Sequence, residues 1–78
     1  MNIQERIQFN LDQISEEIKS RKFDLNSDLG LMSEYAIKAQ RKSFHYLEDM
    51  RVVWDRIQKQ KEMLDMLFEK RKTLENLQ

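Results

Sequence analysis

The chain has 78 residues, of which 14 are basic and 14 acidic, and it contains no cysteine, no proline and one histidine. A chain of this length forms a single domain, and neither disulfides nor a structural zinc site can support its small core. We therefore expect assembly with another chain to provide the missing stability. The net charge of zero argues against nucleic acid as the main partner.

A first helix is predicted from about residue 3 to residue 22. Asn2 and Glu5 have the spacing of a capping box, in which each side chain satisfies a free backbone N–H at the start of a helix. Apolar residues then recur every three or four positions, which marks one face of a helix: Ile3, Ile7, Leu11, Ile14 and Ile18.

The segment 23–27 is predicted to connect this helix to a second one, because Asn26 or Ser27 can cap a new helix. The second helix is predicted to run from about residue 28 to residue 77. Across it, a heptad repeat continues without a slip through Leu29, Met32, Ala36, Ala39, Tyr46, Met50, Val53, Ile57, Leu64, Leu67 and Leu74. Polar residues interrupt the repeat at Ser43, Gln60 and Arg71, and such interruptions commonly fix the register of a coiled coil.

The expected fold is therefore all-α, with one domain over residues 1–78. It is an antiparallel helical hairpin with one short and one long helix, coiled-coil-like, which assembles into a helical bundle. The alternative is a monomeric three-helix bundle, in which the long helix is broken near Ser43–Asp49. That break would expose Phe44, Tyr46 and Leu47 in a turn without glycine, proline or asparagine, so the unbroken helix is favoured.

Beyond Met50 the predicted second helix has no part of its own chain to pack on, although its apolar content is highest there. Because exposed apolar side chains promote aggregation, the sequence predicts an interface with a second copy or with a helical partner. Apolar residues that widen the heptad stripe, as Leu47, Trp54 and Phe68 do, are typical of bundles of three or four helices. Trp54 is the expected energetic anchor. The predicted interface consists of Met50, Val53, Trp54, Ile57, Leu64, Leu67, Phe68 and Leu74.

No residue pattern in the sequence indicates a catalytic, metal or cofactor site. His45 is followed by Glu48 and Asp49, but a lone histidine with two carboxylates is interpreted as a surface or interface residue. The basic clusters 38–42, 56–61 and 70–72 are interrupted or bordered by acidic residues, and are interpreted as solvated helix faces with ion pairs.

The sequence thus predicts a non-enzymatic protein–protein interaction module: a small dimerising coiled-coil adaptor, scaffold or regulatory subunit of a larger complex. It predicts no cofactor and no small-molecule substrate. The alternatives are a chaperone-like cofactor that shields a partner helix and, less favoured, a nucleic-acid-binding helical protein. Because no apolar run is long enough to span a bilayer and no signal-peptide core follows Met1, a cytoplasmic location without membrane contact is expected.

Overall fold

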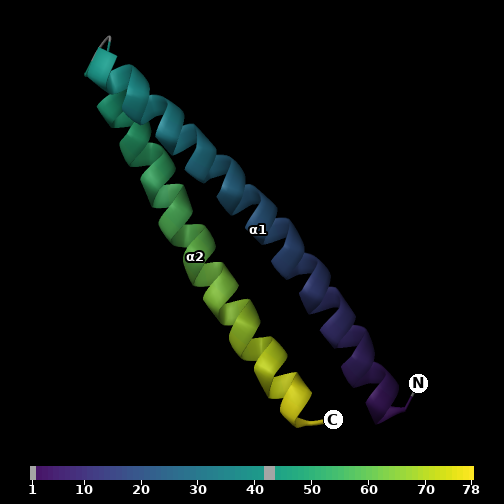
Figure 1. Cartoon of the computed structure of the whole chain (residues 1–78). Helices are drawn as coiled ribbons and strands as arrows, with labels where there is room; N and C mark the ends of the chain where they lie inside the picture. The colour runs from purple at the N-terminus through teal and green to yellow at the C-terminus, as the bar shows by residue number, and fades with distance from the viewer. Residues whose placement is uncertain (1, 42–43) are drawn as a thin grey trace.

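A computed structural model describes residues 2–41 and 44–78, which form two helices and no strand. The helices are α1 (Ile3–Arg41) and α2 (Tyr46–Asn76). They run antiparallel and place both chain termini at one end of a rod with dimensions of 60 × 14 × 14 Å (Figure 1). The all-helical hairpin is confirmed, whereas its assembly into a bundle stays a prediction.

The predicted start of the first helix and end of the second agree with the structure, but the predicted inner boundaries, near residues 22 and 28, are wrong. α1 continues through residues 23–27, where a connection was expected, and ends at Arg41. The physical reason is that the three-four spacing of the inward-facing positions continues across this segment, through Arg21, Leu25 and Asp28. A continuous helix also keeps every backbone N–H and C=O of the segment hydrogen-bonded, which a loop does not. α1 is therefore the longer helix, with 39 residues against 31 in α2, and the expectation of a short first and a long second helix is wrong.

The chain reverses between Arg41 and Tyr46, at the start of the segment where the three-helix alternative placed a break. The three-helix bundle itself does not form, because α1 is unbroken. Ser43 lies outside the described residues. The backbone N–H of Leu47 donates to the carbonyl of Phe44 at 3.0 Å, which closes a tight turn at the entry to α2. The carboxylate of Glu48, in the first turn of α2, interacts favourably with the positive end of the helix dipole.

Asn2 caps α1 as the sequence predicts. Its side-chain Oδ1 accepts a hydrogen bond from the backbone N–H of Glu5 at 2.8 Å, and its carbonyl accepts one from the N–H of Arg6 at 3.0 Å. The side-chain bond satisfies a backbone donor that the first turn of a helix leaves free, and the carbonyl bond is the first regular bond of the helix.

The core is one seam between the two helices. In α2, each seam position from Tyr46 to Leu74 is buried or half-buried, which confirms the heptad repeat there. In the last third of α1 the seam runs through Met32, Tyr35 and Ala39, so Leu29 and Ala36 lie beside it instead of within it. The buried apolar residues are Ile7, Leu11, Ile18, Val53, Ile57, Leu64 and Leu67. The core is thin because these seven residues form a single line between two helices, with no second layer of helices over it.

Candidate interaction surfaces

The structure divides the eight residues of the predicted interface into two groups. Val53, Ile57, Leu64 and Leu67 are buried against α1 of the same chain. The expectation that nothing of the chain itself covers α2 beyond Met50 is wrong, because α1 reaches Arg41 and lies along α2. Of the remaining four residues, Trp54 is 53% exposed, and Met50, Phe68 and Leu74 are half-buried. Their part in a contact between chains stays a prediction.

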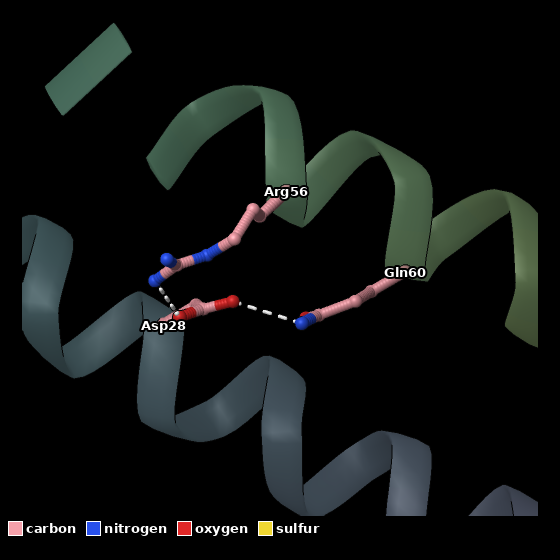
Figure 2. A network of polar contacts seen from close by, with 3 residues as sticks. All are labelled: Asp28, Arg56 and Gln60. Carbon is pink, nitrogen blue, oxygen red and sulfur yellow. Dashed lines mark hydrogen bonds and ion pairs between the residues drawn. The ribbon is translucent and has the colours of Figure 1, made fainter. Parts of the chain in front are cut away.

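A polar layer crosses the apolar seam at Asp28, Arg56 and Gln60 (Figure 2). The Arg56 Nη2 donates to Asp28 Oδ1 at 2.6 Å, and Gln60 Nε2 donates to Asp28 Oδ2 at 2.8 Å. The Arg56 hydrogen bond lowers the pKa of Asp28 below its ordinary value of 3.8; burial of the carboxyl opposes this effect, and the Gln60 hydrogen bond adds to it. Asp28 in turn raises the pKa of Arg56. The layer therefore holds a carboxylate that is 8% exposed in its charged form.

This layer fixes the register of the hairpin. If one helix slipped by a heptad, Asp28 would face Val53 or Leu67 and would lose both of its hydrogen bonds. Gln60 was predicted to fix a register, and the structure shows its partner. Asp28 and Arg56 were missed, because Asp28 was placed in the first turn of a second helix. The signal that identifies Asp28 is its position, seven residues after the inward-facing Arg21.

The other polar candidates are dispersed. The cluster at 38–42 pairs Lys38 with Glu34 at 3.0 Å, and Lys42 lies outside the described residues. Arg71 lies 3.8 Å from Glu75. His45 is exposed immediately before α2. Within residues 2–41 and 44–78, no three histidine, aspartate or glutamate side chains are grouped as metal ligands would be. Neither helix, over the same residues, contains a stretch long and apolar enough to cross a membrane.

Phe68 and Trp54 lie on the same flank of α2 but have different surroundings. The Phe68 ring is covered by Lys22 of α1 and by Arg71, whose charged groups lie 5.5 and 5.2 Å from its centroid. Two heptads away along both helices, the pair equivalent to Lys22 and Phe68 is Ala36 and Trp54. Alanine is too short to cover an indole ring, which leaves Trp54 53% exposed.

The outer faces of the two helices carry different residue types. The outward-facing positions of α2 repeat every seven residues and are acidic in four of five cases: Glu48, Asp55, Glu62, Glu69 and Asn76. The equivalent positions of α1 are Phe9, Glu16, Phe23, Gly30 and Ile37. Among these, Phe9, Phe23 and Ile37 are 53%, 71% and 50% exposed.

One side of α1 carries no charge over its last five turns, and we call it the neutral face. It lies outside the seam, with the half-buried Ala36 at its edge, and consists of Phe23, Asn26, Leu29, Gly30, Ser33, Ala36, Ile37 and Gln40. The heptad register of the Lys22–Phe68 contact places Trp54 of α2 level with Ala36, at the border of this face. Since 36% of the residues in the chain are charged, a solvated helix surface of this length would be expected to include charged side chains.

A second apolar surface lies near the chain termini. A shallow, open groove there is lined mainly by apolar atoms of Ile14, Met66 and Leu74, with Asn10, Lys70 and Thr73 among its polar residues. Met66 is 65% exposed. This groove offers a comparison surface for the neutral face. Comparisons with protein-family models, curated proteins and solved structures find no match to the chain.

Proposed function

We propose that the chain is a non-enzymatic protein–protein interaction module: a helical hairpin that dimerises into a four-helix bundle and serves as an adaptor, scaffold or regulatory subunit of a larger complex. The supporting observation is the distribution of its apolar side chains. Eleven large ones among the described residues are between 47% and 82% exposed, whereas seven apolar residues are buried. Where such side chains are contiguous on one face, exposed apolar surface marks contacts with other proteins.

The thin core supports the same proposal. Fully burying one large apolar side chain contributes about 1.5–3 kcal/mol, so a half-exposed one still has about half of this to gain. A second hairpin packed on the first would supply the second layer of helices that two helices alone lack. Trp54 is the strongest candidate for an anchor, because tryptophan is enriched among the residues that dominate binding energy.

The polar chemistry of the hairpin supports a structural role. Both carboxylate oxygens of Asp28 accept hydrogen bonds that tie α1 to α2, at 2.6 and 2.8 Å. A carboxylate held in this way is ionised and occupied, so it is unsuited to proton transfer. We also propose a cytoplasmic location, because a chain without cysteine gains nothing from an oxidising compartment.

Light scattering coupled to size exclusion, at two protein concentrations, tests the proposal. The expected mass is about 19 kDa, twice the 9.6 kDa of one chain. A mass of 9.6 kDa at both concentrations contradicts self-association. It would favour the alternative function, a cofactor that shields the helix of a partner in a one-to-one complex.

A further inference from the structure

We propose that a second copy of this chain binds the neutral face, with the two α1 helices antiparallel and a two-fold axis at Ser33. This inference rests on the self-association proposed above and assigns it to one surface. The two helices differ in the side chains that they expose to water. The outward-facing positions of α2 are mostly acidic, which suits a surface in contact with water. The neutral face of α1 has no charge, and its side chains Phe23, Leu29 and Ile37 are 71%, 47% and 50% exposed.

The neutral face is complementary to itself, which identifies a second copy of the chain as its occupant. In an antiparallel pair centred on Ser33, residues equally far from Ser33 on either side lie opposite each other. Leu29 then faces Ile37 of the second copy, so apolar meets apolar. In the same way Gly30 faces Ala36, so small meets small, and Asn26 faces Gln40, so amide meets amide. A two-fold contact requires this kind of self-complementary surface.

Gly30 lies on the neutral face. A Cβ atom added at Gly30 would meet nothing within 4 Å, so packing within the hairpin does not require a glycine there. Glycine within a helix is less stable than alanine, so its presence has a cost. In the proposed dimer Gly30 lies opposite Ala36 of the second copy, beside which Trp54 stands half exposed. The missing side chain leaves room for the indole ring.

Charge selects the antiparallel orientation. Lys22 immediately precedes Phe23, the first residue of the neutral face. Lys61 of α2 is one heptad from the Lys22–Phe68 contact, which places it level with Leu29 on the same flank of the hairpin. A parallel pair of hairpins would bring each lysine level with the same residue of the other copy. In the antiparallel pair the two copies of Lys22 lie 22 residues apart along the axis, or about 33 Å at 1.5 Å per residue.

The arrangement predicts the length of the dimer. The neutral face runs from Phe23 to Gln40, which is 18 residues of α1 or about 27 Å. Two rods of 60 Å that overlap over this length form a particle about 90 Å long. A bundle overlapping along its whole length would keep the 60 Å of one hairpin.

Matched substitutions test the face. Ile37→Asp should weaken dimerisation at least tenfold in light scattering, and Phe9→Asp should leave it unchanged. Both residues occupy outward-facing positions of α1 and are similarly exposed, at 50% and 53%. Gly30→Leu is a second variant. A Cβ atom at position 30 has open space within the hairpin, so circular dichroism should show unchanged helicity. Light scattering should show a monomer. Dissociation by Phe9→Asp, or by Met66→Ala in the groove near the termini, with Ile37→Asp and Gly30→Leu still dimeric, overturns the proposal.

Cross-linking tests the orientation, and the absence of native cysteine makes single-cysteine variants unambiguous. With a short bis-maleimide, Ser33→Cys should link the two copies and Ser15→Cys should not. Small-angle scattering should give a longest dimension near 90 Å instead of 60 Å. Linking through Ser15→Cys, or a dimer of 60 Å, overturns this face while leaving self-association intact. A wild-type monomer contradicts both proposals.

Discussion

Replacing Asp28 by alanine tests whether the polar layer holds the hairpin together. The substitution leaves the half-buried Gln60 amide without its acceptor, which costs about 1–3 kcal/mol. The loss of the Arg56 ion pair adds little, because the Arg56 side chain is 51% exposed and regains water. Alanine returns roughly 0.5 kcal/mol through its higher helix propensity. The expected net loss is about 2 kcal/mol.

The assay is urea unfolding followed by circular dichroism at one fixed protein concentration, because dimerisation makes stability depend on concentration. Asp24→Ala is the matched control, since Asp24 is exposed one turn earlier on α1; it should change stability by less than about 0.5 kcal/mol. The double variant Asp28→Leu with Gln60→Leu should recover the loss, because replacing a buried polar set by apolar residues is often neutral or stabilising. If Asp28→Ala unfolds at the same urea concentration as the wild type, the layer does not stabilise the hairpin.

Three further outcomes follow from the same contacts. Because folding lowers the pKa of Asp28, the contribution of its carboxylate to the free energy of unfolding is complete above pH 3.8 and is lost as the pH falls through the pKa of the folded state. Unfolding curves from pH 7 to pH 2 should show this loss of stability, and Asp28→Asn should reduce it. Gly30→Ala in the monomeric Ile37→Asp background should raise the free energy of unfolding by about 0.5–1 kcal/mol, and a decrease in urea unfolding would show that Gly30 is needed within the hairpin. Leu64→Ala, at a site 6% exposed, should lower thermal stability by about 2 kcal/mol, while the exposed Met66→Ala changes it little; equal effects would mean that the seam is not the core.

The periodicity of the apolar residues was sufficient to predict the fold class and the seam of α2. It was insufficient for α1, because three signals near Asn26, Ser27 and Gly30 resemble a helix end and a new start. Those residues lie on the exposed side of α1, where capping residues and glycine are tolerated at modest cost. The inward-facing positions of the same segment are Arg21, Leu25 and Asp28, and two charged residues in three concealed the continuing seam.

The wrong inner boundaries of the predicted helices explain why the predicted interface on α2 is partly wrong. With a first helix ending near residue 22, the apolar residues of α2 beyond Met50 needed a partner from another chain. With α1 ending at Arg41, four of them are buried internally and the unpaired surface moves to α1 and Trp54. The neutral face could not be recognised from the sequence alone, because Leu29 and Ala36 were assigned to the seam, and only the position of α2 shows that they lie outside it.

The polar layer and the neutral face are mechanically connected. Asp28 points into the hairpin and its neighbours Leu29 and Gly30 lie on the neutral face, so the contacts of Asp28 with Arg56 and Gln60 also set which residue of α2 stands beside Ala36. A slip by one heptad would move Trp54 about 10 Å along α1, away from the position at which it faces Gly30 of a second copy. A fully apolar layer would permit that slip. The Asp28→Leu, Gln60→Leu double variant should therefore retain or gain hairpin stability yet dimerise more weakly, and tight dimerisation by it would show that the polar layer does not position Trp54.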